Sequence, residues 1–279
     1  MDEIVVKSQA KINIGLNIIS KRDDGYHNLE TIFYPINLFD EIRFTKNDEF
    51  YFNSNDDNLN NEKTNLIIKS KESLEKHFNT PLPVKVFLNK QIPIGAGLGG
   101  GSSNAASTIL ALKKLFNLEI EPETLRRLAL NLGSDVPFFI NPLPSFAESR
   151  GEYLTQINFK LDKYLLIVNP GIHVATKWAF GLIKSNRPEE RLKSLIGKSQ
   201  IQINDVMKIA TNDFENLVFE YFPEIQEIKE KMLNFGARYS MMTGTGSTVW
   251  AMFDDEEAAY QTELFFKCKN YFTFIQEPI

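Results

Sequence analysis

Cysteine is almost absent from this chain. Among 279 residues only Cys268 carries a thiol, so no disulfide can form within the chain. Disulfides are usual in secreted domains and rare in the cytosol, and we therefore expect a cytoplasmic protein. The N-terminus carries acidic residues at positions 2 and 3 and lacks the apolar core of a secretion signal. No run reaches the roughly 18 apolar residues that span a bilayer, so we expect a soluble protein without a membrane partner.

Positive charge and histidine are also scarce. Lys and Arg number 31 against 36 Asp and Glu, which gives a net charge of −5. Proteins that bind nucleic acid need a basic surface, so this balance argues against a nucleic-acid partner. The three histidines and the single cysteine do not have metal-ligand spacing, and we expect no metal held by a protein cluster. The composition, 43% apolar and 24% charged, is that of a folded protein long enough for two domains.

Two periodicities predict a mixed α+β fold. Ile12, Ile14 and Leu16 alternate with polar residues or glycine, as in a strand with one apolar face. Further elements follow from the same patterns: strands at 29–33, 84–88, 165–168 and 248–253, helices at 65–78, 105–116, 122–133 and 225–235, and polar surface segments at 47–63 and 184–200. A boundary between residues 155 and 156 would divide the chain into two mixed α/β domains, 1–155 and 156–279.

The run PIGAGLGGGSSN, residues 93–104, holds five of the 15 glycines. A strand leads into this glycine loop and an amphipathic helix follows it. Glycine lets main-chain N–H groups come within hydrogen-bond distance of a ligand. The start of a helix adds unpaired N–H groups and the positive end of the helix dipole. The pattern therefore predicts a binding site for a polyphosphate.

The glycine loop has three other interpretations. Gly95-x-Gly97-x-x-Gly100 matches the dinucleotide-binding fingerprint, but the acid expected about 20 residues later would fall between two helices, at Glu119 to Glu123. A P-loop would need a Gly-Lys-Ser/Thr sequence, which the run lacks. A flexible linker joins domains, whereas this run joins a strand to an amphipathic helix.

The sequence PIGAGLGGGSSNAA resembles the phosphate-binding motif of the GHMP kinase superfamily, with one extra glycine. The resemblance implies a two-domain α+β GHMP kinase fold, in which a ribosomal-protein-S5-like domain precedes a ferredoxin-like α/β sandwich. It implies ATP and Mg²⁺ as cofactors, the first domain binding ATP and the second the substrate. The residues that it assigns to the nucleotide are Asn65, Lys90, Pro93, Ile94, Gly95, Ala96, Gly97, Leu98, Gly99, Gly100, Gly101, Ser102, Ser103 and Asn104.

Two N-terminal motifs narrow the resemblance. AKINIGL at residues 10–16 and RDDGYHNL at residues 22–29 resemble the start of the 4-diphosphocytidyl-2-C-methyl-D-erythritol kinases, a family within the superfamily. Four later stretches continue the likeness in the same order: 65–67, 132–139, 212–215 and 242–247. This family phosphorylates the 2-hydroxyl of a cytidine-diphosphate sugar alcohol in non-mevalonate isoprenoid synthesis. The resemblance therefore implies a small-molecule substrate and says nothing of the oligomeric state.

The catalytic residues implied by the resemblance are Lys11 and Asp135. From residue type alone, Lys11 could be an exposed lysine at the edge of a sheet and Asp135 a turn or capping aspartate. The resemblance implies that Asp135 accepts the hydroxyl proton, and that Lys11 keeps Asp135 ionised, favours the acceptor alkoxide and helps to position the hydroxyl. An ordinary carboxylate is a weak base for an alcohol, so positioning contributes as well.

The substrate contacts implied by the resemblance are Asn13, Tyr26, His27 and Phe180. Tyr26 would stack on the cytosine and His27 would form hydrogen bonds to it. Phe180 supplies the second aromatic ring, with Trp178 as an alternative two residues away. The pattern departs from the family at Ser149, where a glycine is frequent.

Two alternative functions stay open. Another small-molecule GHMP kinase, acting on homoserine or mevalonate, would share the glycine loop but not the Tyr26-His27 turn. A non-catalytic nucleotide-binding or RNA-binding module would need neither Lys11 nor Asp135, and the acidic net charge disfavours RNA.

Overall fold

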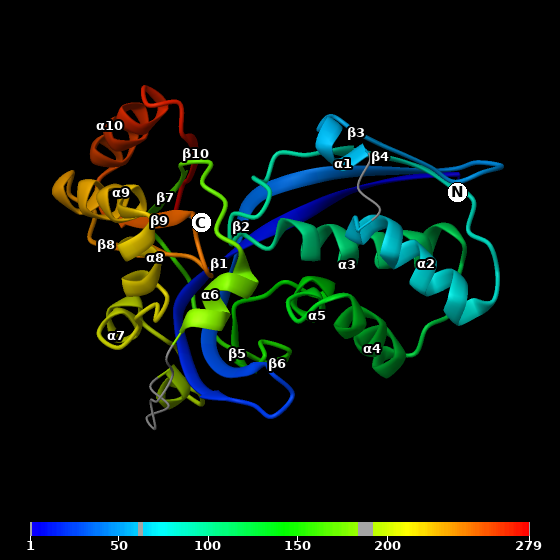
Figure 1. Ribbon diagram of the computed structural model, residues 1–279, viewed down its shortest axis with the longest axis horizontal. Helices are drawn as coiled ribbons and strands as arrows, with labels where there is room; N and C mark the ends of the chain where they lie inside the picture. The colour runs from blue at the N-terminus through cyan, green and yellow to red at the C-terminus, as the bar shows by residue number, and fades with distance from the viewer. Residues whose placement is uncertain (1, 61–63, 184–191, 279) are drawn as a thin grey trace. The chain divides into compact units, whose positions relative to one another are not determined.

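The computed structural model describes residues 2–60, 64–183 and 192–278 (Figure 1). Strands and helices are mixed along the chain, as the predicted α+β fold class requires. The described residues group into two compact units, each of which is built from separated segments. The first unit contains Met1–Ala10, Asn37–Ile94 and Gly99–Pro142, and the second contains Lys11–Ile36, Gly95–Leu98 and Leu143–Ile279. The single boundary at 155/156 stays a prediction.

A sheet of long strands supports the first unit. β1 pairs with β2, β2 pairs antiparallel with β4, and the short β3 pairs in parallel with β4. Val84, Val86 and Leu88 point into the core, whereas the intervening Lys85 and Phe87 are exposed, so the period of two is visible in burial. The bounds of these strands are β1 Glu3–Lys21, β2 His27–Lys46, β3 Tyr51–Ser54 and β4 Val84–Asn89.

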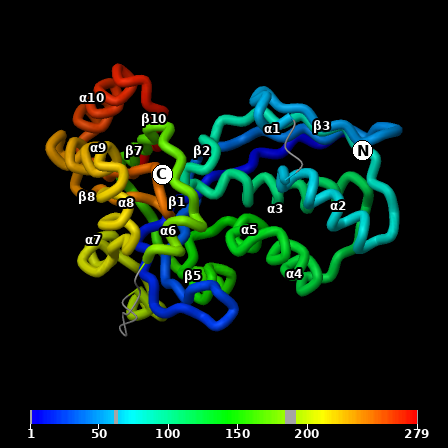
Figure 2. Tube along the Cα trace, in the orientation of Figure 1, coloured from blue at the N-terminus to red at the C-terminus, as the bar shows by residue number. Residues whose placement is uncertain are grey.

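Helices cover the apolar face of this part of the sheet. α2 and α3 lie side by side, and the trace in Figure 2 shows the same arrangement. Ile109 and Leu112 of α3 are completely buried in one cluster with Phe44 and Leu88 of the strands. The bounds of the helices in this unit are α1 Asp57–Asn60, α2 Leu66–Phe78, α3 Gly100–Leu115, α4 Pro122–Leu132 and α5 Val136–Ile140.

The second unit contains two sets of paired strands. The N-terminal half of β2 pairs antiparallel with β5, which in turn pairs with β6. A separate antiparallel sheet has the strand order β10-β7-β9-β8. The bounds of these strands are β5 Ser145–Ser149, β6 Tyr153–Gln156, β7 Tyr164–Asn169, β8 Tyr239–Met242, β9 Val249–Phe253 and β10 Phe272–Gln276.

Two helices, α9 and α10, pack against the separate sheet of the second unit (Figure 1). Ile228 of α9 and Phe266 of α10 are buried in one apolar cluster with Leu166 and Phe253 of the strands. Among the described residues no helix has the length and apolarity needed to cross a membrane. The bounds of the helical elements are α6 Thr176–Leu182, η1 Leu192–Leu195, α7 Ile203–Met207, α8 Glu215–Tyr221, α9 Pro223–Asn234 and α10 Glu256–Lys267.

The predicted elements are confirmed where periodicity was strong and corrected where it was weak. The strand expected at 29–33 is part of the much longer β2, because its alternation continues through Ile42 and Phe44. The polar segment expected at 47–63 contains β3 and α1, and its residues 61–63 lie outside the described residues. In the connection expected at 184–200, residues 184–191 also lie outside them, and η1 forms just after.

Candidate functional site

The glycine loop leaves β4 and enters α3 at Gly100. Gly95, Gly97 and Gly99 have φ angles of 65°, 77° and 71°, a region that residues with a Cβ rarely adopt. Ala96 and Leu98, the alternate residues, are almost completely buried. The loop is therefore a firmly anchored turn, which argues against the flexible-linker interpretation.

Close packing leaves no room for a side chain at Gly97. A Cβ at this position would lie 2.4 Å from the carbonyl oxygen of Thr243 and 3.2 Å from that of Gly246. The Thr243 hydroxyl also donates a hydrogen bond of 3.3 Å to the Gly97 carbonyl. The lack of a side chain at Gly97 thus lets the loop approach the second glycine turn, residues 243–247.

The first turn of α3 presents main-chain groups. Its N-cap residue, Gly99, has no side chain that could cap the helix. The hydroxyl of Ser103 accepts a 2.8 Å hydrogen bond from Ser8, and Ser103 is 1% exposed. The amide of Asn104 donates to Asp40 and to Ser8, and Asn104 is also buried. These two side chains point into the first unit, whereas the main-chain N–H groups and the helix dipole of this turn could hold a triphosphate.

Asp40 joins the two ends of the loop and was not identified from the sequence. Its Oδ2 lies 2.5 Å from the ammonium of Lys90, and its Oδ1 accepts 2.8 Å hydrogen bonds from the N–H groups of Gln91 and Ile92. Burial lowers the pKa of Lys90, and the charge of Asp40 opposes that shift. The only signal in the sequence is an acid within the apolar alternation of β2.

Replacing Lys90 by methionine is expected to lower the free energy of unfolding by about 3 kcal/mol, because it removes the cation that pairs with the buried charge of Asp40. Urea denaturation measures this change. Lys85→Met on the same strand is the control, since Lys85 is exposed and its loss is expected to cost less than about 0.5 kcal/mol. Equal effects of the two substitutions would contradict a buried ion pair at Asp40.

Asn65 and Asp135 each stand at the start of a helix in the first unit. Asn65 is the N-cap of α2, and its Oδ1 accepts a 2.9 Å hydrogen bond from the N–H of Ile67. Its contact with a nucleotide stays a prediction. Asp135 occupies the N-cap position of α5, is half-buried and makes no capping hydrogen bond with its side chain. The interpretation of Asp135 as a turn residue is confirmed for its backbone, because it lies in the turn before α5, whereas its side chain does not cap the helix.

Lys11 lies in the interior of the second unit. It is 4% exposed, so the interpretation as an exposed edge lysine is wrong. Its ammonium donates to Asn13 Oδ1 at 2.5 Å and to the Gly97 carbonyl at 3.3 Å, and it lies 4.9 Å from the centroid of the Phe33 ring. These contacts hold the cation beside the glycine loop.

Asn13 orients Lys11 through a set of buried hydrogen bonds. Its Nδ2 donates to the hydroxyl of Thr31 at 2.9 Å, which leaves its Oδ1 facing the ammonium of Lys11. Its main-chain N–H donates to the Thr243 hydroxyl at 2.8 Å, and its carbonyl accepts from the indole of Trp250 at 3.0 Å. The predicted contact of Asn13 with substrate is untested, whereas its contact with Lys11 is direct.

The aromatic residues that are predicted to contact the cytosine lie in the second unit. The His27 ring is 5.4 Å from the Phe180 ring, and Phe180 packs at 4.8 Å on the buried Phe214. Trp178 instead packs on Tyr221 and Phe222, which favours Phe180 over Trp178 as the partner of His27. Burial and, secondarily, the charge of Lys21 lower the pKa of His27, so its imidazole is neutral at physiological pH.

Tyr26 is exposed, with 53% of it accessible to solvent, whereas the adjacent His27 is buried. The guanidinium of Arg150 lies 4.6 Å from the centroid of its ring. Within the described residues no group of three or more His, Cys, Asp or Glu is arranged to hold a metal ion.

Comparison with known proteins gives consistent matches along the chain. Residues 65–141 match the model of the GHMP kinases N terminal domain, and residues 192–271 match that of the GHMP kinases C terminal domain. The chain is 42% identical over 254 residues to the 4-diphosphocytidyl-2-C-methyl-D-erythritol kinase of Bacteroides fragilis, an alignment that covers 89% of this chain and 91% of the relative. It is 37% identical over 264 residues to the enzyme of that name from Prosthecochloris aestuarii, with coverages of 93% and 92%.

Solved structures agree with these matches. A crystal structure of 4-(cytidine 5'-diphospho)-2C-methyl-D-erythritol kinase superposes with a TM-score of 0.80 at 27% identity and covers 98% of each chain. The mevalonate kinase of Methanococcus jannaschii superposes with a TM-score of 0.70 at 18% identity, over 99% of this chain and 98% of the other. The second likeness shows a shared fold.

Proposed function

The chain belongs to the GHMP kinases and, within them, to the 4-diphosphocytidyl-2-C-methyl-D-erythritol kinases, and from this premise we propose that it phosphorylates the 2-hydroxyl of 4-diphosphocytidyl-2-C-methyl-D-erythritol with ATP. The oxygen of that hydroxyl forms a bond to the γ-phosphorus of ATP, the bond from γ-phosphorus to the β,γ-bridging oxygen breaks, and ADP leaves. The observation that carries the choice of substrate is the turn with Tyr26 and His27, whose imidazole lies beside Phe180.

The proposed catalytic roles follow from side-chain chemistry. Asp135 accepts the proton of the 2-hydroxyl as its oxygen bonds to phosphorus. Lys11 offsets the negative charge that develops on the transferring phosphoryl group. The hydrogen bonds from Lys11 to Asn13 and to the Gly97 carbonyl preset the position of its ammonium, so little reorganisation accompanies the reaction.

We further propose that the glycine loop holds ATP chiefly through main-chain N–H groups near the start of α3. The uncapped first turn and the positive φ angles of the loop support this assignment. Mg²⁺, when bound with ATP, would offset phosphate charge and be held mainly by phosphate oxygens. A cytoplasmic location stays a prediction, as does the absence of nucleic-acid and membrane partners.

A side-by-side assay of ADP release tests the proposal. The purified chain with ATP and Mg²⁺ is expected to release ADP with 4-diphosphocytidyl-2-C-methyl-D-erythritol and not with homoserine or mevalonate. Tyr26→Ala is expected to raise KM for the cytidyl substrate by about 5- to 150-fold, because base–aromatic stacking contributes about 1–3 kcal/mol. ADP release with homoserine or mevalonate and none with the cytidyl substrate would overturn the proposal.

A further inference from the structure

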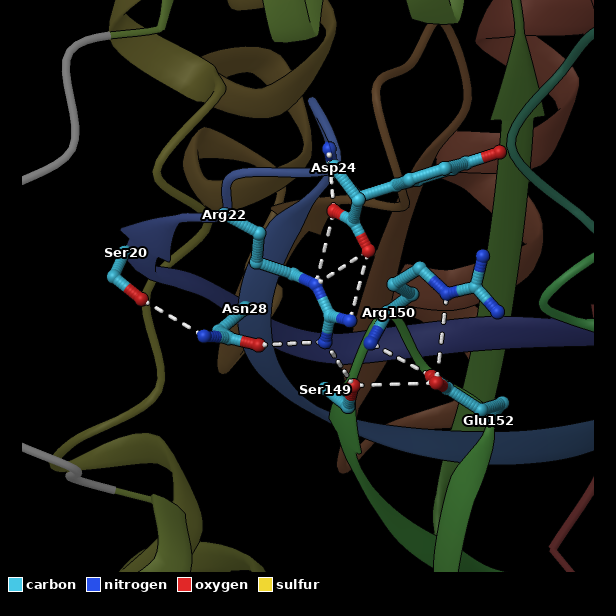
Figure 3. Close-up of polar contacts among 8 residues, drawn as sticks. Ser20, Arg22, Asp24, Asn28, Ser149, Arg150 and Glu152 are labelled. Carbon is cyan, nitrogen blue, oxygen red and sulfur yellow. Dashed lines mark hydrogen bonds and ion pairs between the residues drawn. The ribbon is translucent and has the colours of Figure 1, made fainter.

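The turn that presents Tyr26 is tied to the end of β5 by a polar network within the second unit (Figure 3). Arg22 donates to both carboxylate oxygens of Asp24, at 2.9 to 3.1 Å, and Asp24 Oδ1 accepts from the main-chain N–H of Tyr26 at 3.1 Å. The hydrogen bond between them raises the pKa of Arg22 and lowers that of Asp24. Arg22 also donates to the hydroxyl of Ser149 at 2.9 Å.

Ser149 is the departure from the family pattern noted in the sequence. Its φ angle is 64°, a region that glycine adopts freely and that serine rarely adopts. The hydroxyl accepts from Arg22 and donates to Glu152 Oε1 at 3.2 Å. This serine therefore supplies a bridge that a glycine could not make.

Glu152 connects Ser149 to Arg150. It is 8% exposed, accepts from the Arg150 main-chain N–H at 2.7 Å and lies 3.5 Å from the Arg150 Nε (Figure 3). The guanidinium of Arg150 lies over the ring of Tyr26, 4.6 Å from its centroid. Tyr26 is thus held twice: through its main chain by Asp24, and on one face of its ring by Arg150.

We propose that Arg150 and Ser149 are positioning residues for substrate binding, which hold the Tyr26 ring in place so that its other face receives the cytosine. The proposal rests on the proposed function. A cation on one face of an aromatic ring is attracted by its quadrupole and fixes the ring before the ligand arrives. A ring that is already ordered loses less conformational freedom on binding, which increases affinity.

The experiment measures the binding of cytidine 5'-diphosphate by titration calorimetry, together with KM and kcat. Arg150→Ala is expected to weaken that binding by about 3- to 30-fold, the range for a cation over an aromatic ring. KM for the cytidyl substrate should rise in parallel, with kcat and the KM for ATP within about twofold of wild type. Arg150→Lys keeps a cation and should recover part of the affinity.

Ser149→Gly separates positioning from folding. Glycine accepts a φ of 64° without strain but removes the hydroxyl that joins Arg22 to Glu152, so we expect weaker binding of cytidine 5'-diphosphate without loss of kcat. A merely structural role would lower the active fraction, and hence the apparent kcat, at constant KM. The matched control for Arg150→Ala is Arg238→Ala, because Arg238 also lies over a tyrosine ring, that of Tyr239, and also pairs with a carboxylate, that of Asp254. It should leave binding unchanged.

Two failures can be told apart. If the wild-type chain does not bind cytidine 5'-diphosphate, the proposed function fails and this inference fails with it. If the wild-type chain binds it and Arg150→Ala and Ser149→Gly bind equally well, the positioning role is overturned while the proposed function stands.

Discussion

Replacing Asp135 by asparagine is expected to lower kcat by about 10²- to 10⁴-fold, because general-base catalysis by a positioned carboxylate contributes about that much. Both KM values should stay within about threefold of wild type, since the lost interaction acts mainly in the transition state. Steady-state ADP release, with both substrates varied, measures the three constants.

The fold of the Asp135→Asn variant is expected to persist. Asparagine has nearly the same shape as aspartate, and it suits the N-cap position before α5 that Asp135 occupies. Asp48→Asn serves as the control, because Asp48 is exposed in a loop and its substitution should change no kinetic constant. If Asp135→Asn retained kcat within about threefold, Asp135 would not be the proton acceptor, and positioning would account for the reaction.

Gly97→Ala is expected to damage both the stability and the nucleotide site. The added Cβ would lie 2.4 Å from the Thr243 carbonyl oxygen, and main-chain atoms cannot rotate away as a side chain can. The φ angle of 77° adds backbone strain. The clash and the strain together are expected to lower the free energy of unfolding by about 2–5 kcal/mol. Because the displaced carbonyl of Gly97 also accepts from Lys11, kcat/KM for ATP should fall by about 10²-fold or more.

The matched control for Gly97→Ala is Gly101→Ala in the first turn of α3. There the Cβ would meet only the Leu66 Cδ1, at 3.7 Å, and Gly101 does not have a positive φ. The unfolding free energy of this control should be unchanged or higher by up to about 1 kcal/mol, because alanine favours the helix. Urea denaturation of both variants makes the comparison. Equal stability of the two would contradict the close approach between Gly97 and Thr243.

Much of the local structure follows from short-range patterns of residue type in the sequence. The alternation at Val84, Val86 and Leu88 predicts β4, and these residues are buried while Lys85 between them is exposed. Pro122 and Gly133 mark the two ends of α4 because proline suits a first helical position and glycine a position just past the last turn. β3 and α1 are missed because each has only four residues, too few to show a period.

The candidate site also has some features that follow from local sequence and others that follow from tertiary contacts. The sequence by itself determined the family, the residue types at Lys11, Asp135 and the glycine loop, and the order of these motifs, because residues close in the chain make up each motif. Only the tertiary structure decided that Lys11 is buried, that Asp40 ties Lys90 to α3, and that Gly97 packs against Thr243. Such contacts join residues 50 and 146 positions apart, as for Lys90 with Asp40 and Thr243 with Gly97. No period in the sequence encodes them, because each depends on how completed strands and loops pack together.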